Sequence, residues 1–173
     1  CGYNTMVEKQ ESVEAAWSQV ENVYQRRADL IPNLVATVKG YAQHEEETLT
    51  KVVEARSKAT SVTIDPTNLD EASLQKFQQA QDGLSSALSR LLMVQENYPD
   101  LKANEQFRDL QTQLEGTENR ITVERQKFND TARDYNTYIR QFPNNLYAGF
   151  FGFSAKPYFA AKAGADEAPE VKF

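Results

Sequence analysis

Apolar side chains recur every three or four residues through most of this chain, and this spacing constrains its fold more than any other feature. The interval matches the 3.6-residue turn of an α-helix, so each run places its apolar residues on one face. Such a helix is unstable alone and gains stability when apolar faces pack together. Four runs are present, and the pattern predicts an all-α protein: one domain over residues 1–173, built as an antiparallel up-down four-helix bundle with long helices.

Three breaks in the pattern set the expected bounds of the helices. The first break lies at Pro32, the second is the loop 60–68, and the third is the segment 97–104. We expect helices over about 3–28, 32–59, 69–97 and 105–141, and the last two begin after candidate N-caps, Asn68 and Asn104. The predicted apolar faces include Val13, Trp17, Val20, Tyr24, Leu34, Val38, Leu49, Val52, Leu74, Phe77, Leu84, Leu88, Leu110, Leu114, Ile121, Phe128, Tyr135 and Ile139.

The first break, ADLIPNL, has two interpretations. Proline has no N–H group and its ring crowds the preceding turn, so it favours the first turn of a helix. We therefore predict a tight turn over residues 29–31 and a new helix that begins at Pro32. The alternative is a single long helix kinked at Pro32.

Residues 142–173 differ from the rest, because they hold six of the nine phenylalanines and three of the six prolines. We expect an irregular strap that folds back over the bundle. The alternative is an exposed aromatic surface that docks on a partner or a membrane. Disorder is a third possibility, chiefly over 163–170. The candidate docking patch contains Phe150, Phe151, Phe153, Tyr158 and Phe159.

A polar band accompanies the apolar face of the fourth predicted helix. Asn129 and Asn136 are seven residues apart and therefore return to nearly the same face. One interpretation is that the band pairs across the bundle and fixes helix register, in which case Glu118 or another carboxylate reaches a buried arginine. The other is a polar groove for a peptide or a small ligand. The candidate residues are Arg26, Arg27, Asn33, Arg56, Glu118, Arg125, Asn129, Arg133 and Asn136.

The residue counts argue against an enzyme and against a cofactor or metal. His44 is the one histidine, so the sequence lacks the two Glu-x-x-His motifs of a di-iron bundle. Metal binding by His44 and the glutamates after it is the remaining alternative. Neither G-x-G-x-x-G nor G-x-x-x-x-G-K occurs. The net charge of −6 disfavours nucleic acid as a partner, and no apolar run is long enough to span a bilayer.

Several blocks of the sequence resemble the LemA family. They are YNTMV, AAWSQV, RRADLIPNLVATVKGYAQHE, EARSKA, LSRLLMVQENYPDLKANEQFRDLQTQLEGTENRI, DYNTYIRQFPNN and EVKF. They occur in the family's order over nearly the whole chain. The resemblance implies a bacterial envelope protein with a long antiparallel helical bundle, and it implies no catalytic or metal-binding residues. We expect a protein-interaction or scaffold module with an envelope protein as partner; the alternative is a sensor of peptides or small ligands that uses the polar groove.

The resemblance departs from the family at the N-terminus. Family members usually carry a membrane-spanning helix before the YN motif, and here Cys1, the sole cysteine, stands in that place. Mature bacterial lipoproteins begin with a diacylglycerol-modified cysteine, so we expect Cys1 to tether the bundle to a membrane, facing the periplasm or the exterior. Gly2 in place of Asp slightly favours the outer membrane. The alternative is that Cys1 is a cut point within a longer protein.

Overall fold

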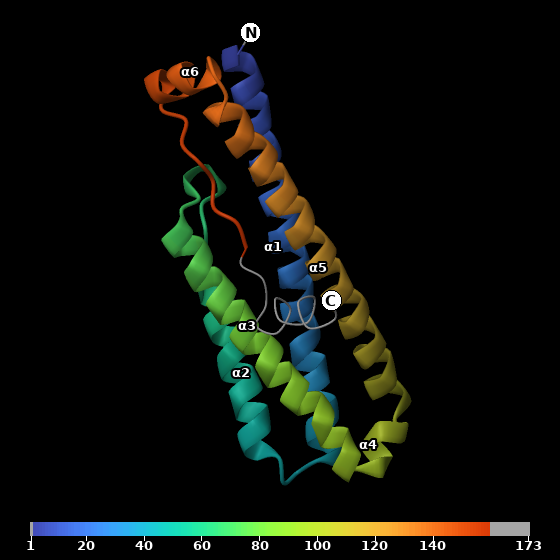
Figure 1. The fold of residues 1–173 in the computed structure, drawn as a ribbon. Coiled ribbons are helices and arrows are strands. Elements are labelled where there is room, and N and C mark those ends of the chain that lie inside the picture. The colour runs from blue at the N-terminus through green and yellow to red at the C-terminus, as the bar shows by residue number, and fades with distance from the viewer. Residues whose placement is uncertain (1, 160–173) are drawn as a thin grey trace, which may run out of the picture.

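The computed structural model describes residues 2–159, except for the side chain of Asn68, and this part of the chain is helical without strands. The α-helices are α1 (Gly2–Tyr41), α2 (Glu46–Ser61), α3 (Glu71–Met93), α4 (Pro99–Ala103), α5 (Glu105–Arg140) and α6 (Asn144–Phe151). Two 3-10 helices, η1 (Pro66–Asn68) and η2 (Val94–Asn97), lie beside α3. The predicted all-α class is confirmed. The prediction of only four helices was too simple, because the described residues form six α-helices. Figure 1 shows α1, α2, α3 and α5 along one axis, with α4 at one end and α6 across the other.

Helix α1 runs without a break through Pro32, so the predicted turn at residues 29–31 is wrong. The chain instead reverses between Tyr41 and Glu46. Pro32 removes the N–H that would bond to the carbonyl of Ala28, four residues earlier. Arg56 of α2 replaces this donor, because its Nε donates to the Ala28 carbonyl at 2.9 Å. A tertiary contact thus satisfies the carbonyl that proline leaves free.

The ends of α3 and α5 are set by local capping. Asp70, not Asn68, is the N-cap of α3, and its carboxylate accepts a hydrogen bond from the Ser73 N–H at 2.7 Å. Asn104 caps α5 as predicted, because its Oδ1 accepts from the Phe107 N–H at 2.8 Å. Each cap satisfies one of the four amide groups that a helix start leaves unbonded.

The predicted apolar faces meet in two buried clusters along the rod. One surrounds Trp17, whose ring centroid lies 5.0 Å from that of Phe77 and 5.6 Å from that of Phe128. The other surrounds Leu34 and Phe107. Helices α1, α3 and α5 each contribute to both clusters, so these three helices join the halves of the molecule.

After α5 the chain forms α6 and then turns back toward the middle of the rod, as Figure 1 shows. Gly152 ends α6 with φ of 78°, a left-handed conformation that residues with a Cβ rarely adopt. We name residues 152–159 the strap. Residues 160–173, which include the segment 163–170 for which disorder was the third alternative, lie outside the described part of the chain.

Candidate functional site

Two asparagines of α5 hold the main chain of the strap. Asn136 Oδ1 accepts from the Lys156 N–H at 2.7 Å, and its Nδ2 donates to the Lys156 carbonyl at 2.9 Å. Asn129 repeats the pattern with Phe159, at 2.8 Å and 3.1 Å. Each carboxamide therefore pairs with both backbone groups of one strap residue. We name this arrangement the strap seat.

The spacing of the two asparagines matches the repeat of an extended chain. Seven residues of α-helix rise about 10.5 Å. The two strap residues that they hold, Lys156 and Phe159, are three positions apart, and three extended residues span about 10 Å. The seven-residue interval was visible in the sequence, whereas the segment that occupies it was not.

Tyr135 and Tyr158 add polar contacts at the edges of the strap seat. The hydroxyl of Tyr135 donates to the Ser154 carbonyl at 3.0 Å. Burial raises the pKa of Tyr135, because it disfavours the charged phenolate. Asn136 Nδ2 also donates to the hydroxyl of Tyr158 at 2.8 Å. Most of these contacts reach backbone atoms, which every extended peptide presents.

Phe159 is the side chain that anchors the strap. Its ring stacks on Trp17 at 5.9 Å between centroids and meets Phe128 edge-on at 5.5 Å. The guanidinium carbon of Arg125 lies 4.7 Å from the centre of the same ring, and Phe159 is buried. Aromatic packing and a cation over the ring both favour this position. The seat therefore combines main-chain pairing with one aromatic pocket.

A second polar cluster surrounds Arg27, which is buried between the two apolar clusters. Its Nη1 donates to Ser85 Oγ at 2.6 Å and to Glu118 Oε1 at 2.9 Å. Its Nη2 donates to the carbonyl and to the side-chain oxygen of Gln81, at 2.9 Å and 2.8 Å. The prediction that a carboxylate reaches a buried arginine is confirmed. All four Nη hydrogens are engaged, and the cluster links α1, α3 and α5.

The nine predicted polar residues do not line one groove. Arg27 and Glu118 belong to the buried cluster, and Arg56 bonds to Ala28. Arg26 and Asn33 are exposed on α1. The remaining four lie at the strap: Arg125, Asn129, Arg133 and Asn136.

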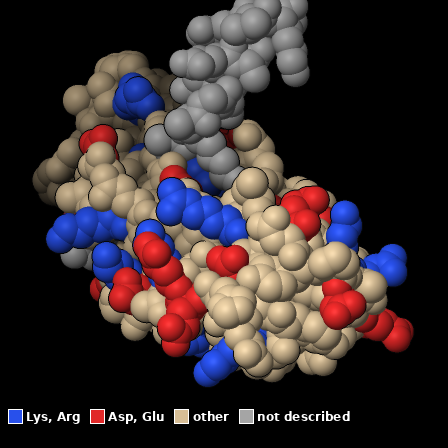
Figure 2. All heavy atoms as spheres, turned by 90° about the horizontal axis from the view of Figure 1, so that it is seen from below, with Lys and Arg blue, Asp and Glu red and all other residues tan. Residues whose placement is uncertain are grey.

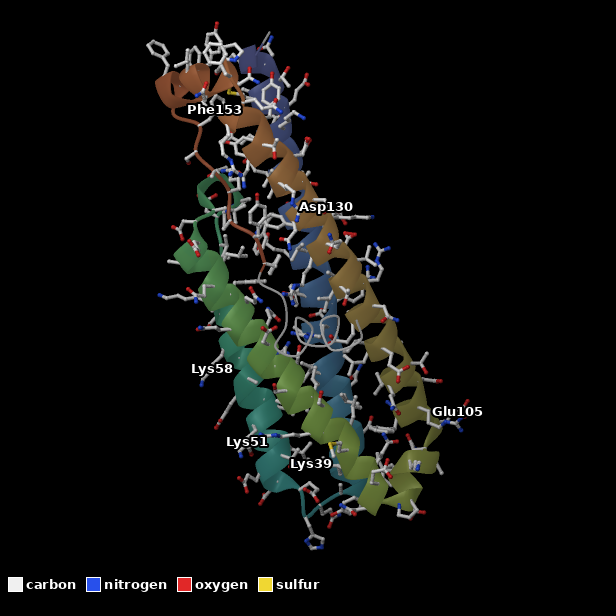
Figure 3. The ribbon with its side chains drawn as sticks, viewed as in Figure 1. Lys39, Lys51, Lys58, Glu105, Asp130 and Phe153 are labelled. Carbon is white, nitrogen blue, oxygen red and sulfur yellow. The ribbon has the colours of Figure 1, made fainter. Side chains whose placement is uncertain are left out.

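The five residues of the predicted docking patch are also divided. Phe159 is buried and Phe153 is half-buried, and Figure 3 places Phe153 at the α6 end of the molecule. Phe150 and Phe151 are exposed on α6, and Tyr158 is exposed on the strap. The structure thus separates an exposed aromatic surface from the strap anchor.

Sequence reasoning missed two parts of the strap seat. Trp17 and Tyr135 were assigned to the core alone, although the Trp17 ring stacks on Phe159 and the Tyr135 hydroxyl bonds to Ser154 of the strap. Gln81 was not selected, because a glutamine on a helix gives no signal of burial. The seven-residue interval of the two asparagines and their adjacency to apolar-face residues were the hints of the strap seat in the sequence.

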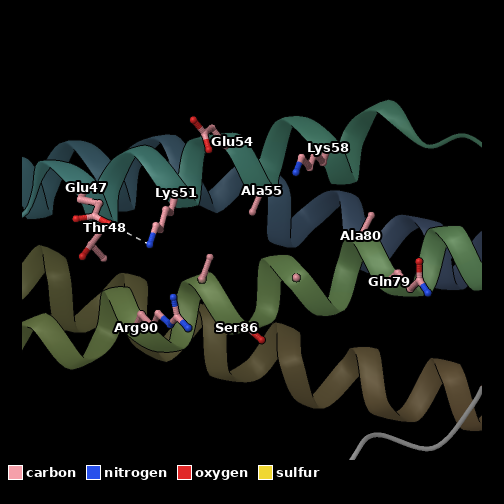
Figure 4. A pocket seen from close by; sticks show the side chains of 12 residues that line it. Glu47, Thr48, Lys51, Glu54, Ala55, Lys58, Gln79, Ala80, Ser86 and Arg90 are labelled. Carbon is pink, nitrogen blue, oxygen red and sulfur yellow. Dashed lines mark ion pairs between the residues drawn. The ribbon is translucent and has the colours of Figure 1, made fainter.

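A shallow groove between α2 and α3 holds none of the predicted site residues. Small side chains, Ala55 and Ala80, form part of its lining, and an ion pair of 3.1 Å between Lys51 and Glu47 lies at its rim (Figure 4). Within the described residues, no group of three potential metal ligands is found. No helix among them combines the length and apolar character needed to cross a membrane.

Comparison with known proteins identifies the relatives of this chain. It is 29% identical over 181 residues to magnetosome protein MamQ 2 of Paramagnetospirillum magneticum, covering 95% of this chain and 66% of that protein. It is 28% identical over 145 residues to protein LemA of Metamycoplasma hominis, covering 84% and 63%. The chain spans slightly less than two thirds of each relative. Residues 16–173 match the LemA family model, and the chain therefore belongs to the LemA family.

Proposed function

We propose that this chain is a membrane-tethered protein of the bacterial cell envelope that acts by binding polypeptide, as an interaction or scaffold module. Membership of the LemA family supports the envelope assignment. One observation carries the binding role: α5 already holds an extended segment of polypeptide through paired hydrogen bonds to its main chain. We also propose that α1, α2, α3 and α5 act as an antiparallel four-helix bundle that carries this seat.

The geometry favours polypeptide over a small ligand. Two carboxamides at the repeat of an extended chain recognise the backbone, which many peptides share. The buried guanidinium of Arg27, the other candidate for ligand binding, has its four Nη hydrogens engaged within the protein. The alternative role as a peptide sensor remains compatible with this site, since an incoming peptide would replace the strap.

Lipidation of Cys1 belongs to this proposal and provides the tether. The mass of the N-terminal peptide, from protein made in its own host, tests it. We expect diacylglycerol on Cys1. An unmodified cysteine within a longer peptide would contradict the lipid tether and leave the polypeptide-binding role to its own test.

Crosslinking in cells tests the binding role. A photoreactive amino acid replaces Arg133, which is exposed and lies 6.0 Å from the centre of the Tyr158 ring. The matched control replaces Val123, which is exposed on the same helix. We expect a discrete adduct from position 133 alone, mapped to one extended segment of a partner. Phe159→Ala should raise its yield, because it weakens the strap.

Two outcomes of this experiment would contradict the binding role. One is the absence of a position-133 adduct both with the native strap and with Phe159→Ala. The other is equal crosslinking from positions 133 and 123, which would indicate non-specific proximity.

A further inference from the structure

The end of the molecule that carries α6 has no charged side chain on the two segments that form it. Residues 2–7 and 141–155 contain no Asp, Glu, Lys or Arg, although such residues make up 25% of the whole chain. The two segments meet in space: a Cβ added at Gly2 would lie 3.4 Å from Oδ1 of Asn144 and 4.0 Å from the Tyr147 ring. The opposite end differs, because Figure 2 shows Lys, Arg, Asp and Glu mixed across it.

Large apolar side chains are exposed at this uncharged end. Phe142 is 80% exposed, Leu146 63% and Phe150 84%, and Tyr3, Tyr147 and Phe151 are also exposed. Three rings lie together, with centroids 4.7 Å apart for Tyr3 and Phe151, and 5.1 Å apart for Phe150 and Phe151. All of these residues except Phe142 line one surface depression, and an exposed apolar surface of this kind marks an interaction site. We name these six residues the end patch.

The orientation of α6 suits a bilayer. Figure 1 shows α6 across the end of the rod, beside the start of α1. Its eight residues span about 12 Å. The left-handed turn at Gly152 then leads the strap away from this end, so the exposed face of α6 stays uncovered by it. A short helix that lies across a rod and exposes Phe, Leu and Tyr brings these apolar side chains together to the depth at which an interfacial helix buries its apolar face.

We propose that the end patch inserts into the interfacial layer of a lipid bilayer, so that α6 lies in the membrane plane and the rod stands upright. Tyrosine suits the level of the lipid headgroups and phenylalanine the acyl boundary beneath it, and the lack of charge removes the cost of dehydrating ions there. This inference rests on the membrane tether of the proposed function in one respect: residue 2, next to the proposed lipid site, lies at the same end.

Upright docking has a consequence for the strap seat. A lipid at the N-terminus alone would leave the rod free to pivot. Contact through both the terminus and α6 would hold α5 along the membrane normal, with Asn129 and Asn136 at a defined height. The chain would then present the seat to partners at one distance from the membrane.

Co-sedimentation of the full chain with vesicles tests the inference without the lipid tether. The chain carries Cys1→Ser, and the vesicles are neutral phosphatidylcholine. We expect binding that persists when salt is raised, because the end patch carries no charge. Replacing both Leu146 and Phe150 by Ser should reduce the partition coefficient by about tenfold or more. Met93→Ser and Val53→Ser, at exposed positions on other helices, should not change it.

Each other outcome would overturn the inference. No binding of the parent chain, or equal binding of the Leu146/Phe150 variant, would exclude the end patch as a membrane contact. Binding to anionic vesicles alone, lost in salt, would assign the contact to charged residues. A patch-dependent dimer without vesicle binding would assign it to a second copy. Circular dichroism checks that the variants fold. If the vesicle experiment contradicts the membrane contact of the end patch, the separate tests of Cys1 lipidation and of the strap seat still stand.

Discussion

Arg56 supplies a hydrogen bond that the sequence of α1 cannot make for itself. Pro32 leaves the Ala28 carbonyl without its helical donor, and Ala28 is buried. The guanidinium of Arg56 occupies the vacant position at 2.9 Å. A buried carbonyl without a donor is costly, so the two residues are coupled although they lie on different helices.

A double-mutant cycle tests this coupling at the residue scale. Arg56→Leu should lower the free energy of unfolding by about 1–3 kcal/mol, because it leaves the carbonyl unsatisfied. In a Pro32→Ala background the restored N–H meets the same carbonyl, and the cost of Arg56→Leu should fall. Urea unfolding measures the cost of Arg56→Leu in the native background and in the Pro32→Ala background. An equal cost in the two backgrounds would contradict the coupling; Arg26→Leu, at an exposed position of α1, is the control.

At the scale of elements, the strap is held by few contacts and should open before the helices do. From Ser154 to Phe159 its backbone bonds are to side chains of α5, and the buried ring of Phe159 anchors it. Segments with few buried contacts open with lower free energy than core helices. Such local opening is what the strap seat needs if a partner segment is to enter it.

Hydrogen exchange tests the two asparagines separately. Asn136→Ala should speed exchange of the Lys156 amide, and Asn129→Ala should speed exchange of the Phe159 amide, because each loses its acceptor. Amides in the middle of α1 and α5 should keep their protection. Phe150→Ala, on exposed α6, serves as the control. Unprotected Lys156 and Phe159 amides in the parent chain would show that the strap is not held as described.

On the scale of the whole molecule, α1, α3 and α5 bridge the two apolar clusters. The 40 residues of α1 and the 36 of α5 correspond to about 60 Å and 54 Å of helix. The Arg27 cluster lies between the two apolar regions and joins three helices. Because the same helices form both regions, neither half has an independent set of elements.

Unfolding should therefore be a single transition. Trp17, the sole tryptophan, reports on one apolar cluster, and the double variant Trp17→Phe with Phe107→Trp moves the reporter to the other. We expect fluorescence of both proteins to change at the same denaturant concentration as their own circular dichroism. Different midpoints for the two reporters, each compared with circular dichroism of the same protein, would show that the halves unfold separately.

The sequence by itself determined the helical class, the buried faces and the cap at Asn104. These follow from spacing and capping within a few residues, so local physics is sufficient for them. The sequence also showed the seven-residue interval between Asn129 and Asn136, but it did not show that the strap binds to these two residues.

Only the tertiary structure decided the course of α1 and the location of the strap. Pro32 favours a helix start in isolation, and a donor from α2 reversed that preference. The strap pairs with residues 20 and 30 positions earlier, so its register depends on how α5 and the Trp17 cluster are arranged. Contacts between residues distant in sequence carry no periodic signal, and tertiary packing and hydrogen bonding select among them.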